Sequence, residues 1–174
     1  MLTRYTLLVC SIAFLIACGG GGSGSSSDFS NGITATNASI ANYRVRGTSS
    51  LSLPAMPKQI SRYENDGEFT VFYEIDANGV VGLELSLIHT GDSIITCGNE
   101  STEFFAKHCG DGEQCALDGE VSCKFEANNM ISCEGGPKTD LTSFFESIPQ
   151  VVDMVMCVSR RNGGTAQKER VEFR

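Results

Sequence analysis

Residues 69–88 read FTVFYEIDANGVVGLELSLI and carry the strongest fold signal in the chain. Apolar and polar side chains alternate on both sides of a turn at Ala77-Asn78-Gly79, as they do in half-buried strands. A three-residue loop would pair Tyr73 with Leu83, place the apolar side chains on one face and leave glycine where the turn needs a positive φ. Because the buried face sets the register, the pattern predicts an antiparallel hairpin over 69–88.

A second hairpin is predicted over 121–134, with its loop at 127–129, where asparagine tolerates a positive φ. The register that keeps one face apolar pairs Cys123 with Cys133. Residues directly opposite each other in an antiparallel pair lie about 4.5–5.5 Å apart at Cα, within disulfide reach. We therefore favour a bridge between these two cysteines; the alternative is that each points inward and bridges to another element.

A third hairpin is predicted at the C-terminal end of the sequence. Residues 151–159 are apolar on both faces apart from one aspartate, which indicates a central strand. A turn at Asn162-Gly163 returns the chain into 169–173 and would set Met154 opposite Val171.

Two short helices are expected between the hairpins, over Asn99–His108 and Thr139–Ile148. Asn99 can cap the first, and Thr139 or Asp140 the second. Their similar cores, Thr102-Glu103-Phe104-Phe105 and Thr142-Ser143-Phe144-Phe145, suggest two degenerate hairpin–helix units, with chance similarity as the alternative. We interpret the phenylalanine pairs as core anchors. The predicted fold is α+β: an antiparallel sheet of three hairpins with two short helices on one face, braced by disulfides.

Two of the eight cysteines, Cys10 and Cys18, lie in an N-terminal segment with the features of an export signal. The other six lie in the domain that would be exported: Cys97, Cys109, Cys115, Cys123, Cys133 and Cys157. An even number of cysteines in an exported domain predicts three disulfides. With Cys123 and Cys133 paired, three arrangements of the other four stay open: Cys97–Cys109 with Cys115–Cys157, and the two crossed alternatives. No metal site is expected, because the chain has no C-x-x-C pair and His89 and His108 lack zinc-finger spacing.

The charge of the chain is unevenly distributed. Residues 64–153 hold 18 acidic and three basic side chains, a net of −15, whereas 160–174 hold five basic and two acidic ones. Such an acidic body argues against a nucleic-acid partner, whose phosphates need Lys and Arg. We interpret the acidity as a means of solubility rather than of cation binding. The acidic turns at 111–113 and 118–120 could form a weak Ca²⁺ site, but they do not match a calcium loop and are interpreted as solvated turns.

The N-terminal residues have the layout of an export signal: Arg4 is followed by an apolar run that is too short to span a bilayer. The run ends Leu15-Ile16-Ala17-Cys18, which resembles the lipobox of bacterial lipoproteins. The resemblance covers about residues 1–27 and implies that Cys18 is lipidated and becomes the new N-terminus. Gly19 follows where an aspartate would favour the inner membrane, so the resemblance implies the outer membrane.

These signals divide the chain into three parts. Residues 1–17 are expected to be a signal peptide, and 18–30 a lipidated cysteine with a Gly/Ser-rich flexible tether. Residues 31–174 are expected to be one exported domain, largely irregular over 31–62 apart from a short strand at Tyr43–Arg46. We expect the protein in the cell envelope, attached to the outer membrane by lipid on its periplasmic side or at the surface.

None of the common catalytic, dinucleotide or P-loop motifs is present in the sequence. We therefore predict no catalytic residues, no cofactor and a non-enzymatic binding or structural module of unknown ligand, whose partners are the membrane and an unknown protein. The alternative is an extracytoplasmic inhibitor of a hydrolase that uses a disulfide-braced loop at 110–120. A third hypothesis is a small hydrolase that uses two carboxylates.

Overall fold

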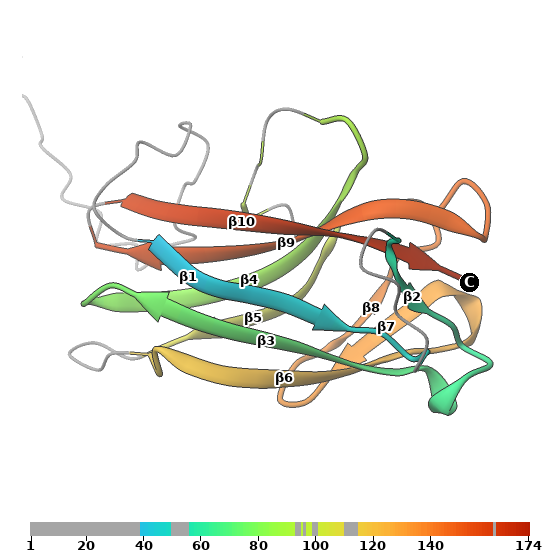
Figure 1. Ribbon diagram of the computed structural model, residues 1–174, viewed down its shortest axis with the longest axis horizontal. Helices are drawn as coiled ribbons and strands as arrows, with labels where there is room; N and C mark the ends of the chain where they lie inside the picture. Colours follow the sequence, from blue (N-terminus) through green and yellow to red (C-terminus); the bar gives the residue numbers. More distant parts are fainter. Residues whose placement is uncertain are drawn as a thin grey trace, which may run out of the picture.

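Two β-sheets lie face to face in the computed structural model, with their strands running along the long axis of the molecule (Figure 1). The structure describes residues 39–49, 56–92, 95, 97–98, 101–109, 115–161 and 163–174. Ten strands occur in these residues: β1 (Ser39–Arg46), β2 (Lys58–Ile60), β3 (Glu68–Asp76), β4 (Val80–His89), β5 (Glu103–His108), β6 (Asp118–Phe125), β7 (Met130–Cys133), β8 (Lys138–Asp140), β9 (Gln150–Arg160) and β10 (Gly163–Phe173).

Each sheet contains five strands. Sheet A has the order β1-β3-β6-β7-β8, and sheet B has the order β2-β10-β9-β4-β5. All neighbouring strands are antiparallel except β2 and β10, which are parallel. The predicted α+β class is therefore wrong: the described residues form a two-layer β-sandwich, and their helical residues are two short 3₁₀ turns, Asn65–Gly67 and Ala127–Asn129.

The first predicted hairpin is also wrong, although both of its strands exist. β3 pairs with β1 and β6, whereas β4 pairs with β9 and β5, so the loop at 77–79 carries the chain from sheet A to sheet B. Gly79 has a φ of 74°, the conformation expected of the turn. The apolar face of each strand is buried equally well whether the two strands pair in one sheet or lie in two sheets that face each other across a core. The alternation therefore predicted the strands but not their partners.

The second hairpin forms in the predicted register. Cys123 of β6 lies opposite Cys133 of β7, and Phe125 lies opposite Ile131. The loop at 127–129 contains Asn128 and Asn129 at φ angles of 61° and 58°. These two asparagines adopt the left-handed conformation that a tight reversal needs.

The third hairpin has the predicted strands in a shifted register. β9 is central in sheet B, as its apolar character indicates. Arg160 pairs with Gly163, so Val152, rather than Met154, lies opposite Val171. The shift is two residues, which leaves every side chain on its predicted face. The apolar pattern therefore cannot distinguish the two registers.

The first predicted helix, Asn99–His108, is replaced by β5 over its described part. Phe104 and Phe105 are both buried, although neighbours in a regular strand face opposite sides. A bulge explains the pair: Leu85 lies opposite Phe105, while the next residue of β4 lies opposite Glu103. The extra residue on β5 lets two consecutive phenylalanines reach the interior, a pattern that otherwise suggests a helix.

The second predicted helix, Thr139–Ile148, is replaced by β8 and a series of turns. Asp140 does act as a cap, because its carboxylate accepts a hydrogen bond from the Thr142 backbone N–H at 2.9 Å. The amides of Phe144 and Phe145 both donate to the carbonyl of Leu141, and no further helical turn follows. The capping signal therefore produced a single turn rather than a helix.

Phenylalanines from both sheets meet in the core between the layers. The Phe125 and Phe173 ring centroids lie 4.9 Å apart and edge to face, which joins sheet A to sheet B. Phe145 lies 5.1 Å from the same Phe173 ring, and Phe69 of β3 lies 6.5 Å from Phe104 of β5. Both predicted phenylalanine pairs are buried, so their interpretation as core anchors is confirmed.

Three disulfides brace the sandwich. Cys123–Cys133 is the pair that the hairpin register favours. The other four cysteines adopt one of the crossed alternatives, Cys97–Cys157 with Cys109–Cys115. Because Cys157 lies on the outer side of β9, the first of these bridges ties Cys97 to the outer face of sheet B, where Ile88, Val155 and Cys157 form a small second apolar cluster. That face is therefore substantially buried.

Candidate functional site

The outward-facing side chains of sheet A form a continuous polar surface, which we call the outer face of sheet A. Strand pairing arranges these side chains in rows across the sheet. One row runs Arg46–Thr70–Ser122, and a neighbouring row runs Arg44–Phe72–Glu120. The full surface comprises Asn42, Arg44, Arg46, Glu68, Thr70, Phe72, Glu74, Asp118, Glu120, Ser122, Lys124, Ser132 and Glu134.

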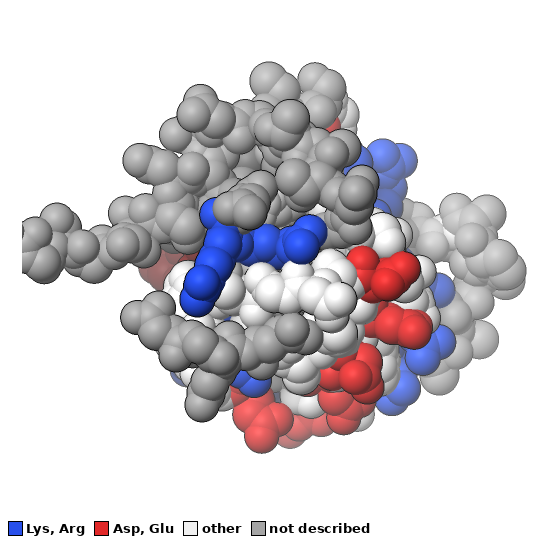
Figure 2. Space-filling view, turned by 90° about the vertical axis from the view of Figure 1, so that its left-hand side faces the viewer, with Lys and Arg blue, Asp and Glu red and all other residues white. Residues whose placement is uncertain are grey.

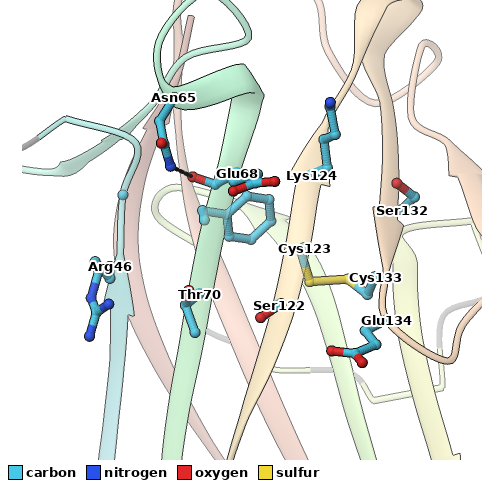
Figure 3. A pocket seen from close by; sticks show the side chains of 12 residues that line it. Arg46, Asn65, Glu68, Thr70, Ser122, Cys123, Lys124, Ser132, Cys133 and Glu134 are labelled. Atoms are coloured by element: carbon cyan, nitrogen blue, oxygen red, sulfur yellow. Dashed lines mark hydrogen bonds between the residues drawn. A yellow bond between two sulfur atoms is a disulfide. The ribbon is translucent and has the colours of Figure 1, made fainter.

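A hollow of ≈ 600 Å³ occupies the end of this face nearest the Cys123–Cys133 bridge (Figure 3). Thr70 and Ser122, from neighbouring strands, lie at its centre, and the Asn65 side-chain amide donates to the Glu68 carbonyl at its rim. Among the described residues, the Thr70 and Ser122 hydroxyls and the Glu134 carboxylate take part in no hydrogen bond or ion pair of the fold. These polar groups are available to a ligand.

Phe72 is the one aromatic side chain on this otherwise polar face, and it is partly exposed. The guanidinium carbons of Arg44 and Arg46 lie 4.8 and 4.6 Å from its ring centroid. Both distances are within the range of cation–π attraction. The ring therefore holds two cationic side chains of the edge strand β1 close together.

A second hollow of ≈ 620 Å³ lies beside Phe72, toward the other end of the face. Its charged lining is mainly acidic, with Glu74, Asp118 and Glu120 facing Arg44. The negative charge of Asp118 and partial burial both raise the pKa of Tyr73, with burial the larger cause. Figure 2 shows the end of the molecule at the left of Figure 1, where one group of basic side chains lies above a band of acidic ones and further basic side chains lie beside that band.

A third, smaller cleft of ≈ 340 Å³ lies at the seam where β1 meets β2 and β10; we call it the seam cleft. Arg44, Arg46 and Lys58 line it together with Glu169. The Glu169 carboxylate accepts a short hydrogen bond from the Val45 backbone N–H, on the edge of β1 that faces away from β3.

Burial shifts two pKa values at this seam. Desolvation raises the pKa of the Glu169 carboxyl, against the hydrogen bond from Val45 and the positive charges of Lys58 and Arg44, which lower it. Desolvation also raises the pKa of Tyr43 well above its usual range, with the Glu169 charge adding to the effect. The buried Tyr43 hydroxyl donates to the Met154 carbonyl at 3.1 Å, which fixes β1 onto sheet B.

Some of the predicted site residues lie outside the described residues, and the others belong to the sandwich. Cys18 and residues 111–113 lie outside the described residues, and the other acidic turn, 118–120, is the start of β6. The six cysteines expected in the exported domain are all in disulfides. No group of three or more His, Cys, Asp or Glu side chains suited to a metal ion occurs in the described part of the chain. No helix in that part is long and apolar enough to cross a membrane.

The arrangement of Arg44, Arg46 and Phe72 was not predicted from the sequence, although a signal for it exists. Arginines two residues apart on a strand share a face. Phe72 also interrupts the polar side of an alternating strand, between Thr70 and Glu74. Aromatic and arginine side chains are enriched at interfaces, so an aromatic residue beside arginines at a solvent-facing position indicates a candidate binding surface. What the sequence lacks is the pairing of β1 with β3, which brings these three side chains together.

No known protein family, curated protein or solved structure was found to match this chain.

Proposed function

We propose that the protein is a lipid-anchored binding module of the cell envelope, held on a membrane through Cys18 and binding its ligand on the outer face of sheet A. The anchor rests on the lipobox resemblance of residues 15–18 and on the Gly/Ser-rich tether that follows. The binding role rests on the structure of the exported domain. The proposal concerns a non-enzymatic module.

One observation carries the binding role: the polar face of sheet A is hollowed and left open, whereas the outer face of sheet B is substantially buried. Thr70 on β3 and Ser122 on β6 lie opposite each other and offer hydroxyl groups, and Glu134, directly after β7, offers a carboxylate beside Ser122. Polar groups on rigid strands bind with little loss of conformational entropy. Phe72 adds an apolar contact in the neighbouring second hollow.

The anchor is tested by replacing Cys18 with serine. The variant should no longer incorporate labelled fatty acid, and it should leave the membrane fraction, because the thiol is the site of lipid attachment. Cys10→Ser is the matched control, since Cys10 lies in the segment expected to be removed. Unchanged membrane association of Cys18→Ser would exclude the lipid anchor.

The binding face is tested in living cells with a photocrosslinking amino acid in place of Ser122. Ser143 is a matched control, because it is also an exposed serine but lies in the turns after β8. A discrete crosslinked adduct should form from position 122 and not from position 143. Adducts that form equally from both positions, or from neither, would contradict binding on this face.

A second candidate, an inhibitor of a hydrolase, is favoured by one feature. Cys109 and Cys115 form a disulfide across a sequence separation of six residues, which closes a small covalent ring at the base of the predicted inhibitory loop. Covalent closure preorganises a loop for binding. Slowed hydrolysis by a muramidase or protease on addition of the protein, reversed in the Cys109→Ala/Cys115→Ala variant, would support this candidate over the first.

A further inference from the structure

The seam cleft carries an excess of positive charge, from cationic side chains on two strands, β1 and β2. Three cationic side chains, Arg44, Arg46 and Lys58, line it with one carboxylate, Glu169. The chain as a whole has a net charge of −8, so this positive cleft is opposite in sign to the molecule that carries it. A local excess of positive charge raises the local concentration of anions.

None of the three cations makes an ion pair with a carboxylate in the described part of the chain. The ion pairs that do form there involve Lys124, Lys138, Lys168, Arg170 and Arg174. Glu169, the carboxylate of the cleft, accepts the Val45 amide hydrogen and forms no ion pair with the cations: Lys58 and Arg44 act on it only as nearby charges. The guanidinium groups therefore keep their hydrogen-bond donors for another acceptor.

The two arginines are also held in place before any ligand arrives. Both pack on the Phe72 ring, with guanidinium carbons at 4.8 and 4.6 Å from its centroid. Two guanidinium groups near one ring repel each other, and a bridging anion removes that repulsion. Arginine binds carboxylate and phosphate oxygens in pairs through its planar fork, and prior ordering reduces the entropy lost on binding.

We propose that the seam cleft binds an oxyanion with at least two free oxygens, a carboxylate or a phosphate, held by Arg44 and Arg46 with Lys58 at the rim. The volume of ≈ 340 Å³ suits a small charged group. Arg44 and Arg46 also belong to the outer face of sheet A, so this inference rests on the proposed function in one respect: the oxyanion is the charged end of the ligand bound there.

The test is a titration of the full-length protein in nonionic detergent with inorganic phosphate and with glucuronate, followed by the ¹⁵N resonances of the arginine side chains. Saturable shifts with either anion are expected, and the anion that binds more tightly identifies the source of the oxyanion. Arg44→Gln/Arg46→Gln should weaken binding at least tenfold. The control pair, Lys107→Gln/Arg161→Gln, removes the same charge from exposed sites elsewhere and should leave the affinity unchanged.

Two further variants distinguish binding at the seam cleft from general electrostatic attraction of anions to the protein. Phe72→Leu keeps every charge but removes the ring, so it should weaken binding severalfold. Glu169→Gln removes the negative charge from the cleft and should tighten binding severalfold. Absence of saturable shifts with both anions, or equal losses in the control pair, would overturn the proposal. A positive titration together with no crosslink at position 122 would retain the oxyanion site and reject the proposed binding face.

Discussion

Glu169 stabilises the seam between β1 and β10 through one hydrogen bond, at the cost of partly burying its charge. Its carboxylate accepts the Val45 amide hydrogen, which the edge strand would otherwise leave without a partner. The cost is partial desolvation of a charge, which raises the pKa of the carboxyl. A glutamine side chain could accept the same hydrogen bond without that cost.

We therefore predict that Glu169→Gln increases the free energy of unfolding at neutral pH and has less effect in acid. A carboxyl whose pKa is raised in the folded state favours the protonated form, so its contribution to stability is present at low pH and is lost as the pH rises through the folded pKa. Urea denaturation of both proteins from pH 3 to pH 8 measures the difference. A difference that grows toward low pH would contradict this sign.

At the scale of secondary-structure elements, the sequence predicted strands better than their partners. The register of β6 and β7 could be predicted because a short loop joins them and Cys123 and Cys133 then fall opposite each other. The partners of β3 and β4 could not, because an apolar face is compatible with a hairpin and with two opposed sheets. The strand β5 was missed because a bulge turns both Phe104 and Phe105 inward.

The disulfides that join these elements should differ in their contribution to stability. Cys97–Cys157 spans a sequence separation of 60 and Cys123–Cys133 one of 10. From chain entropy alone, removal should cost about 4 kcal/mol for the longer loop and about 3 kcal/mol for the shorter one. We predict that Cys97→Ala/Cys157→Ala lowers the unfolding free energy more than Cys123→Ala/Cys133→Ala does. Chemical denaturation of the two double variants compares them, and the reverse order would show that strain or packing outweighs loop entropy.

At the scale of the whole molecule, net charge bears on the class of partner and not on the architecture. The acidic body argued against nucleic acid, and the structure adds that the cations of the seam cleft are too few to follow a phosphate backbone. The basic cleft itself could not be predicted from net charge. It depends on β1, β2 and β10 meeting at one seam, which no local pattern encodes.

We predict no measurable binding of double-stranded DNA or of single-stranded RNA at physiological salt. Long-range repulsion from the acidic surface should outweigh attraction to one small positive cleft. Fluorescence anisotropy with labelled oligonucleotides measures this directly. A micromolar affinity that falls steeply with salt would show that the positive charges act together over a larger area than the cleft.

The edges of the two sheets bear on how neighbouring copies of the protein would interact under the proposed membrane anchoring. β2 and β8, which each end a sheet, are three residues long, and the longer edge strand β1 has its Val45 amide covered by Glu169. The fourth edge strand, β5, has six residues and lies against β7 and β8 of the other sheet. Short or blocked edges resist strand pairing between copies. Proteins tethered to a bilayer diffuse in two dimensions and collide far more often than they would at the same number in bulk solution. Under the proposed anchoring, these edges would keep neighbouring copies separate while the outer face of sheet A stays accessible.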